Sequence, residues 1–389
     1  MAVLEPFSQE EFPHRLTRTQ KGMRAAGLDA ILVSSLANFR YYSGYTPIIA
    51  ESPARPWFVI LPAEGAPIAV IPHMGLEDMR AASWIERIEH WPSPRPADEG
   101  VSLLASAVEE LPVRHGKIGA ELGPETRLGM PQTDFAALSD ACSASIVDAS
   151  EILRQVRAIK SEAEIDRIRK AGACAGEAFA GVANWLKPGM SEREVHRRFQ
   201  AELLTAGVDY VRYLSMGSGQ GGYSSICRGP IERTLGEGDI LALDTGAIVD
   251  GYFCDFDRNY ALGHTNEEAQ RAYDILYKAI EAGLAAAAPG QTCAELWGAM
   301  NEILEKAGVE ASSIGRMGHG LGLALTEQPS LHPDDLTVIE QGMVLTLEPG
   351  LLYKHDGAQH LMVHEENIVI GDGGATLLSP RATAELVVI

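Results

Sequence analysis

The sequence lacks the features that mark extracellular and membrane proteins. Its 389 residues include five cysteines and no C-x-x-C pair, which argues against a disulfide framework and a cysteine-based zinc site. No apolar run approaches the roughly 18 residues that a membrane span needs. The N-terminus, MAVLEPFSQEEF, has no basic start followed by an apolar stretch and so does not resemble a secretory signal. We therefore expect a cytoplasmic protein that does not bind a membrane.

Basic residues are also scarce. The chain has 32 lysines and arginines against 53 aspartates and glutamates, which gives a net charge of −21. A protein with this balance is not expected to present a basic surface to nucleic acid. The hydrophobic fraction of 46% is ordinary for a globular protein, and the length is typical of two or three domains. The excess acid either keeps the surface solvated or places carboxylates around a metal, and only residue positions decide between these.

Residues 1–150 alternate between helix and strand patterns. Apolar residues recur with helical spacing over 15–26 and 101–111. Short apolar runs typical of buried strands occupy 29–34, 57–61 and 68–71. This alternation predicts a layered α/β domain over residues 1–150.

Residues 151–389 contain the same arrangement twice. S-x-x-E at 191–194 and T-x-x-E at 292–295 both have the capping-box pattern of a helix start. Both helices end at Ala-Gly-Val, and 292 − 191 and 308 − 207 both equal 101. Similar boxes at Ser161 and Thr265 predict a longer helix before each copy. We interpret the pattern as an internal duplication with a site between its halves.

Several familiar catalytic motifs are absent or misplaced. Residues 217–222 match G-x-G-x-x-G, but Tyr223-Ser-Ser-Ile follows, which favours a strand or loop over the helix that a dinucleotide site requires. The sequence has no P-loop and no G-x-S-x-G elbow. His364-Glu365 does not begin an H-E-x-x-H zinc motif, because residue 368 is isoleucine.

Two aspartates flank a predicted hairpin. Asp244 ends an apolar strand-like run, and aspartate is depleted in strands, so its position needs a reason. Asp250-Gly251 is a strong hairpin turn signal. A hairpin there would bring Asp244 towards Asp255, and two such carboxylates repel unless they share a proton or a cation.

The second copy carries matching groups. His319 lies among glycines in GHGLG, Glu348 follows the apolar run LTL, and Glu365 precedes the strand-like ENIVI. Together with the two aspartates they make a set of four carboxylates and one imidazole. Such an oxygen-rich set suits a pair of divalent ions such as Mn²⁺, Co²⁺ or Fe²⁺, with Zn²⁺ as an alternative.

At these motifs the chain resembles a known family. The segments DTGAIVDGYFCDFDR, GHGLGL, LEPG and HEENIVI are similar to those of the M24 metallopeptidases, which include methionine aminopeptidase, Xaa-Pro aminopeptidase, prolidase and creatinase. The resemblance implies an α+β fold: a duplicated "pita-bread" catalytic domain at 151–389, preceded by a ribonuclease-H-like α/β domain at 1–150. The segment ANFRYYSGY at 37–45 is similar to the early motif of the prolidase and creatinase branch.

The resemblance also implies roles for the five residues. Asp244 would chelate one metal, Asp255 and Glu365 would bridge both, and His319 and Glu348 would bind the other. A metal-bridging hydroxide would be the nucleophile, and Glu348 would carry the proton. His319 and Glu348 are therefore the expected catalytic residues as well as ligands.

Three positions depart from the prolyl peptidases of this family. Cys227 and Thr326 stand where a histidine is usual, and Val363 stands where an arginine is common two residues before the last ligand. Neither cysteine nor threonine replaces a cationic donor at the same strength.

Two functions remain open. The first is an exopeptidase or dipeptidase that acts on Xaa-Pro-like short peptides, which is the majority activity in the family. The alternative is a non-peptidase hydrolase or lyase that acts on a small nitrogen compound or osmolyte, such as creatine, ectoine or dimethylsulfoniopropionate. A binding protein without catalysis is a third class, which the intact ligand set disfavours.

Substrate contacts are expected from side chains near the proposed metals. The candidates are Tyr223, Cys227, Arg228, Thr326, Glu327 and His364. Because this branch commonly forms dimers, we expect a homodimer, in which Tyr41 and Arg55 would reach the partner's site.

Overall fold

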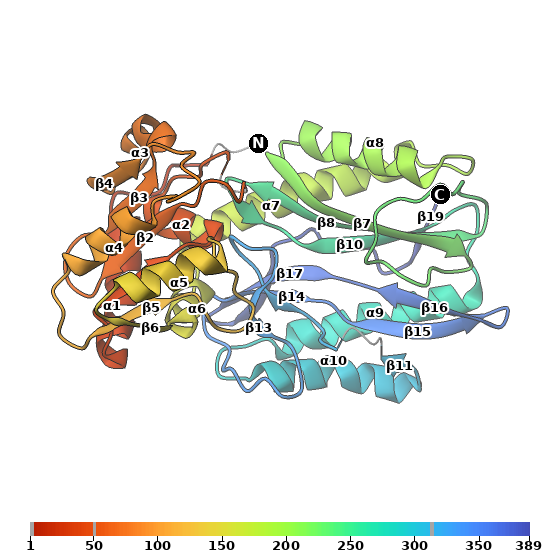
Figure 1. The fold of residues 1–389 in the computed structure, drawn as a ribbon. Helices are drawn as coiled ribbons and strands as arrows, with labels where there is room; N and C mark the ends of the chain where they lie inside the picture. Colours follow the sequence, from red (N-terminus) through yellow and green to blue (C-terminus); the bar gives the residue numbers. More distant parts are fainter. Residues whose placement is uncertain (1–3, 50–51, 312–314) are drawn as a thin grey trace. The chain divides into compact units, whose positions relative to one another are not determined.

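The computed structural model describes residues 4–49, 52–311 and 315–389. The chain divides into two compact units (Figure 1), one over Pro6–Arg157 and one over Ala158–Ile389 together with Leu4 and Glu5. The domain boundary that we place at residue 150 stays a prediction.

The first unit is built on one mixed sheet with the strand order β4-β3-β2-β1-β5-β6. Its strands are β1 Ala30–Val33, β2 Phe58–Pro62, β3 Ile68–Pro72, β4 Arg87–Trp91, β5 Lys117–Ala120 and β6 Ser145–Asp148. Its helices are α1 Glu11–Ala26, α2 Leu36–Ser43, the 3-10 turn η1 His73–Gly75, α3 Leu76–Ala82, α4 Val101–Glu109, α5 Gln132–Ala141 and α6 Ser150–Ala158. Strands β1 to β3 are antiparallel neighbours and are buried at every position. Their continuous apolar runs therefore confirm the three predicted strands.

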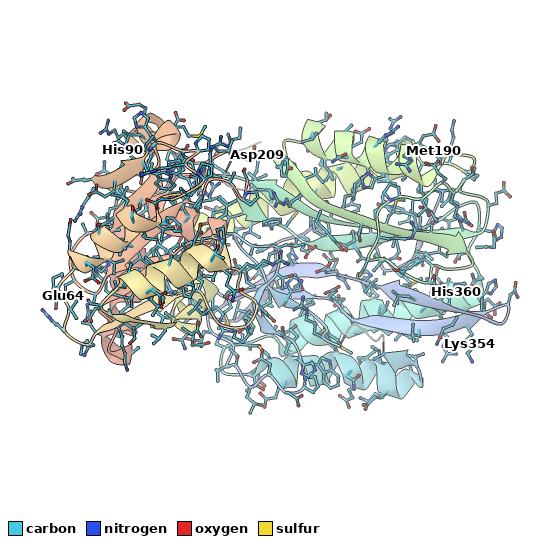
Figure 2. The ribbon with its side chains drawn as sticks, viewed as in Figure 1. Glu64, His90, Met190, Asp209, Lys354 and His360 are labelled. Atoms are coloured by element: carbon cyan, nitrogen blue, oxygen red, sulfur yellow. The ribbon has the colours of Figure 1, made fainter. Side chains whose placement is uncertain are left out.

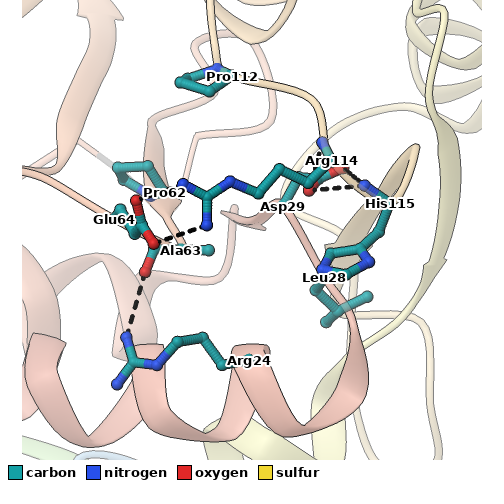
Figure 3. A pocket seen from close by; sticks show the side chains of 9 residues that line it. All are labelled: Arg24, Leu28, Asp29, Pro62, Ala63, Glu64, Pro112, Arg114 and His115. Carbon is teal, nitrogen blue, oxygen red and sulfur yellow. Dashed lines mark hydrogen bonds and ion pairs between the residues drawn. The ribbon is translucent and has the colours of Figure 1, made fainter.

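A buried aspartate fixes the chain at the start of strand β1. The Asp29 carboxylate, just before β1, accepts backbone N–H groups from residues 114–117 at 2.7 to 3.3 Å. Burial opposes ionisation, but these donors together hold the pKa of Asp29 below its usual value. The side chains around the adjacent pocket are drawn in Figure 3. The pocket has a volume of about 260 Å³, and Arg114, which lines it, donates two hydrogen bonds of 2.8 Å to Glu64.

The second unit contains two helix pairs with sheets between them (Figure 1). Its helices are α7 Glu162–Gly181, η2 Val182–Asn184, α8 Glu192–Thr205, α9 Glu267–Ala286 and α10 Cys293–Ala307. Its strands are β7 Tyr210–Gln220, β8 Asp239–Val249, β9 Tyr252–Phe253, β10 Phe256–Ala261, β11 Glu310–Ala311, β12 His319–Gly320, β13 Glu327–Ser330, β14 Val344–Leu347, β15 Gly350–His355, β16 Ala358–Val363, β17 Glu366–Gly371, β18 Gly374–Leu377 and β19 Val387–Val388.

The described strands of this unit form three sheets, one associated with the first helix pair and two with the second. The order β19-β10-β8-β7, with β9 paired to β8, belongs to the first repeat. The orders β13-β12-β14-β17-β18 and β11-β15-β16 belong to the second. Lys354 and His360 lie on the hairpin of β15 and β16 (Figure 2). One buried apolar cluster joins α7 and α8 to β7, β8 and β10, and another joins α9 and α10 to β14 and β17.

The structure confirms three of the four predicted helix starts. Ser161, Ser191 and Thr292 each form a complete capping box. The prediction at Thr265 is wrong by one residue, because Asn266 is the N-cap of α9 and accepts the Ala269 N–H at 2.7 Å. Asparagine caps helices at least as well as threonine.

The predicted hairpin is also confirmed, whereas most of the glycine-rich segment 217–222 is strand rather than loop. Val249 pairs with Tyr252, so Asp250-Gly251 is a two-residue turn. Both turn residues have positive φ, 44° and 76°, as this kind of hairpin requires. Residues 217–220 belong to β7, and no helix follows them, so the structure does not form a dinucleotide-binding turn. Among the residues that the structure describes, no helix has both the length and the apolarity of a membrane span.

Candidate metal centre

The five predicted ligand residues come from both repeats. Asp244 lies in the middle of β8, and Asp255 lies between β9 and β10. The other three belong to the second repeat: His319 begins β12, Glu348 follows β14 and Glu365 immediately precedes β17.

Three of these residues form a compact group. Asp255, His319 and Glu365 are buried, and one potential ligand atom from each lies within 4.8 Å of the others. The Nε2 atom of His319 is 3.6 Å from an Asp255 carboxylate oxygen. Asp244 and Glu348 are close enough for their charges to raise the pKa of both Asp255 and Glu365. The structure therefore brings all five residues into one region.

The carboxylates of this group resist ionisation when no cation is near. Burial raises the pKa of Asp244 to about 6. Burial and the charge of Asp244 raise the pKa of Glu348 to about 7. For Asp255 and Glu365, burial and the neighbouring carboxylates raise the pKa well above the usual value. Cations held among these groups would remove the repulsion and keep them ionised.

Two carboxylate oxygens are left without a partner. The Oδ1 atom of Asp244 and the Oε1 atom of Glu365 are buried and accept no hydrogen bond from the described residues. The other oxygen of Asp244 accepts from the Tyr213 hydroxyl at 3.0 Å and the Ser215 hydroxyl at 3.3 Å. Buried carboxylate oxygens normally have partners, so this donor set fits a group of hard or borderline divalent cations.

The ring of His319 has the tautomer and the neutral charge that a metal ligand requires. The Nδ1 atom of His319 lies 2.9 Å from the carbonyl oxygen of Gly320, to which it can donate only as Nδ1–H. This tautomer leaves Nε2 as the free ligand atom. Burial lowers the pKa of His319 to about 4, so the imidazole is neutral near pH 7. The preceding Gly318 has φ of 133°, and a Cβ atom there would lie 2.1 Å from the Thr346 carbonyl oxygen, which explains why glycine precedes the histidine.

Comparison with known proteins decides the family. The sequence model of metallopeptidase family M24 matches residues 166–372, and that of the creatinase/prolidase N-terminal domain matches residues 15–159. The chain belongs to metallopeptidase family M24. It is therefore a hydrolase of a family that binds divalent metal ions.

Relatives of this M24 protein share nearly its whole length. It is 28% identical to the probable dipeptidase PepE of Mycobacterium tuberculosis over 387 residues, 98% of each chain. It is 25% identical to the Xaa-Pro dipeptidase of Lactobacillus delbrueckii subsp. lactis over 344 residues, 86% of this chain and 89% of that one. The crystal structure of a prolidase from Thermococcus sibiricus superposes with a TM-score of 0.85 at 25% identity, covering 97% of this chain and 99% of that one. These comparisons confirm the predicted pita-bread fold and N-terminal domain.

One acidic residue beside the candidate centre was missed in the sequence of this M24 protein. The direct partner of Asp244 across the β8–β10 ladder is Asp257, and Asp255 lies two residues before it. Asp257 is 1% exposed, and burial together with the charge of Asp244 raises its pKa well above the usual value. Counting back from the Asp250-Gly251 turn places Asp257 opposite Asp244, so the hairpin register was the signal for it.

Two of the predicted substrate contacts lie at accessible positions. Cys227 is exposed, and partial burial, Asp244 and Glu348 raise the pKa of its thiol. The thiol is therefore close enough to the candidate centre for the charges of Asp244 and Glu348 to act on it. Thr326 is exposed and directly precedes β13.

The other predicted substrate contacts have partners within the protein. Tyr223 is 1% exposed, and its hydroxyl donates to Asn259 and accepts the Val363 N–H, each at 3.0 Å. The guanidinium of Arg228 donates two hydrogen bonds of 2.7 Å to the buried carboxylate of Glu192.

Glu327 and His364 are held in a similar way. A buried ion pair of 3.2 Å joins Glu327 to Lys160, and its second oxygen accepts the Ala324 N–H at 3.1 Å. The Nε2 atom of His364 lies 2.9 Å from a guanidinium nitrogen of Arg381, and its ring packs edge-on against Tyr273. In the first unit, Tyr41 is buried and Arg55 is partly buried. A role for these two residues at a partner's site stays a prediction.

Proposed function

We propose that this M24 hydrolase is an exopeptidase that cleaves short peptides, with Xaa-Pro dipeptides as its first candidate substrates. The observation that carries the proposal is the convergence of Asp255, His319 and Glu365 beside two unpartnered carboxylate oxygens. The relatives support the substrate class, because they bear the names dipeptidase and Xaa-Pro dipeptidase. They do not favour a small nitrogen compound or osmolyte.

We propose two divalent ions, with Mn²⁺ as the first to test and Co²⁺, Fe²⁺ and Zn²⁺ as alternatives. The residues that would hold them are Asp244, Asp255, His319, Glu348 and Glu365. Their four carboxylates carry the charge that two divalent cations neutralise, and the imidazole adds none. When bound, such ions acidify a water molecule and polarise the scissile carbonyl.

The side chains have separate tasks in this mechanism. The hydroxyls of Tyr213 and Ser215 orient one oxygen of Asp244 and leave the other free. The neutral His319 presents Nε2 without adding a positive charge. Glu348 would carry the proton, taking it from the attacking water and giving it to the leaving amine nitrogen.

Hydrolysis of a defined peptide panel tests this function. Protein reconstituted with Mn²⁺ is assayed on Xaa-Pro dipeptides, on dipeptides without proline and on Xaa-Pro tripeptides, with amino-acid release as the measurement. We expect release from Xaa-Pro dipeptides that is absent in Asp255→Ala. Wild-type protein that holds two ions per chain and cleaves no member of the panel would contradict the proposal.

We also propose a cytoplasmic homodimer. The five cysteines are free thiols, which suits a reducing compartment, and the resemblance to the prolidase branch supports the dimer. Light scattering during size-exclusion chromatography measures the assembly state directly.

A further inference from the structure

Asp255 and Glu365 are held in place by side chains from each other's segment. The backbone N–H of Asp255 donates to Oδ1 of Asn367 at 2.9 Å. The amide nitrogen of Asn367 donates back to the Asp255 carbonyl oxygen. One side chain from β17 thus satisfies both backbone polar groups of a residue 112 positions earlier in the chain.

Side chains of β10 hold the backbone of Glu365 in the same way. Its backbone N–H donates to Oδ1 of Asp257 at 2.6 Å. Its carbonyl oxygen accepts from the guanidinium of Arg258 at 3.2 Å. Two consecutive residues of β10 therefore fix both polar groups of the Glu365 backbone.

These contacts are buried and are braced by further charges. Asp257, Glu366 and Asn367 are at most 1% exposed. Glu366 forms ion pairs with Arg258 and with Arg381, each at 3.1 Å. Arg381 belongs to the segment after β18. The second oxygen of Asp257 accepts the Asn259 amide at 2.9 Å. The backbone N–H and C=O groups of Asp255 and Glu365 and both oxygens of Asp257 have partners, so neither backbone segment can shift without breaking several buried hydrogen bonds.

We propose that Asp257 and Asn367 are positioning residues that fix the carboxylates of Asp255 and Glu365 at the spacing that a pair of cations requires. The inference rests on the proposed function, in which both carboxylates bind the ions. Asp257 itself is not a ligand in this view, because both of its oxygens already accept hydrogen bonds. Outer partners of this kind orient ligands and commonly change metal affinity by about 10- to 100-fold.

Titration calorimetry with Mn²⁺ alone tests the inference. The proteins compared are wild type, Asp257→Ala, Asn367→Ala and the control Tyr260→Phe. Tyr260 lies on the same strand as Asp257, but its hydroxyl donates to Phe179 in the apolar cluster of the first repeat. We expect affinity to fall at least tenfold in both alanine variants and to stay within twofold of wild type in the control.

Two conservative variants separate an effect on the position of the carboxylates from effects on the stability and charge of the protein. Asp257→Asn keeps an oxygen for the Glu365 N–H, and Asn367→Asp keeps one for the Asp255 N–H. We expect Asp257→Asn to lose less affinity than Asp257→Ala, with a folded circular dichroism spectrum. If an alanine variant does not fold, the two conservative variants carry the test through the same titration.

The possible failures are distinct. Wild-type protein that binds no Mn²⁺ would overturn the proposed function. Wild type that binds two ions, with unchanged affinity in Asp257→Ala and Asn367→Ala, would overturn the positioning role alone. Equal losses in Asp257→Asn and Asp257→Ala would assign Asp257 a purely electrostatic effect and would also overturn it.

Discussion

Arg228 and Glu192 form a bidentate ion pair in which the glutamate side chain is fully buried and the arginine side chain is 26% exposed. The same carboxylate also accepts the Ile231 N–H at 2.8 Å and the Ser218 hydroxyl at 2.5 Å. The pair therefore ties the loop after β7 to the start of α8. This contact gives Arg228 a structural task in addition to the substrate role that the sequence predicts.

Replacement of Arg228 should reduce stability more than substrate affinity. Arg228→Ala leaves a buried carboxylate unpaired, a change that costs about 3 to 5 kcal/mol. Urea unfolding measures this loss, and KM for a cleaved peptide measures the second effect, which we expect to stay within twofold. Glu192→Gln is the matched control for the same contact. A large rise in KM with unchanged unfolding would instead support substrate binding by Arg228.

Cys227 should be the first thiol to react in the native protein. It is exposed, whereas Cys142 is partly buried and Cys174, Cys254 and Cys293 are buried. Because its pKa is raised by partial burial and by nearby Asp244 and Glu348, alkylation of the metal-free protein should be slow near pH 7 and faster as the pH rises. Peptide mass mapping identifies the labelled residue. The rate of peptide hydrolysis after labelling measures the effect of alkylation on activity. Full activity after complete labelling of Cys227 would place the thiol outside the substrate path.

Loss of the cations should matter more for stability at high pH than at low pH. The folded-state pKa values of Asp244 (about 6) and Glu348 (about 7) lie above those of an unfolded chain. The metal-free folded protein therefore binds more protons, so this contribution to stability is full below about pH 4 and is lost as the pH rises to about 7. Bound cations offset this loss of stability, because they neutralise the ionised carboxylates. We expect the difference in Tm between Mn²⁺-loaded and chelated protein to widen from pH 5 to pH 8, and a constant difference would contradict this account.

Asp255→Ala should abolish hydrolysis and metal retention together. The carboxylate belongs to the compact group with His319 and Glu365, whereas the sheet of the first unit has its own buried cluster. Elemental analysis measures the bound metal, and hydrogen exchange over β1 to β3 shows that the first unit stays folded. Retained turnover in this variant would rule out the metal mechanism.

The sequence predicts those parts of the fold that local chemistry specifies. Capping boxes at Ser161, Ser191 and Thr292 and the Asp250-Gly251 turn all act within a few residues, so their patterns are readable without a structure. Thr265 was misassigned because Asn266 beside it is an equally good cap. Each candidate ligand also stood out locally, as an acidic residue or a histidine in strand-like or glycine-rich sequence, and the resemblance of these motifs to the M24 family joined them into one candidate centre.

The remaining contacts depend on distant parts of the chain. Asn367 reaches Asp255 across 112 positions, and Asp257 reaches Glu365 across 108. Arg228 pairs with Glu192, which lies 36 residues earlier in the chain. Arg381, in the segment after β18, contacts His364. No local pattern specifies such partners, so the sequence alone could not separate a structural arginine or histidine from one that contacts substrate.

The division of the candidate ligands between two repeats has a consequence for biosynthesis. Asp244 and Asp255 leave the ribosome about a hundred residues before Glu365 and Asn367. During that interval the chain offers only two of the four candidate carboxylates. In the proposed centre, the complete set of ligand residues therefore exists only after the second repeat has been synthesised.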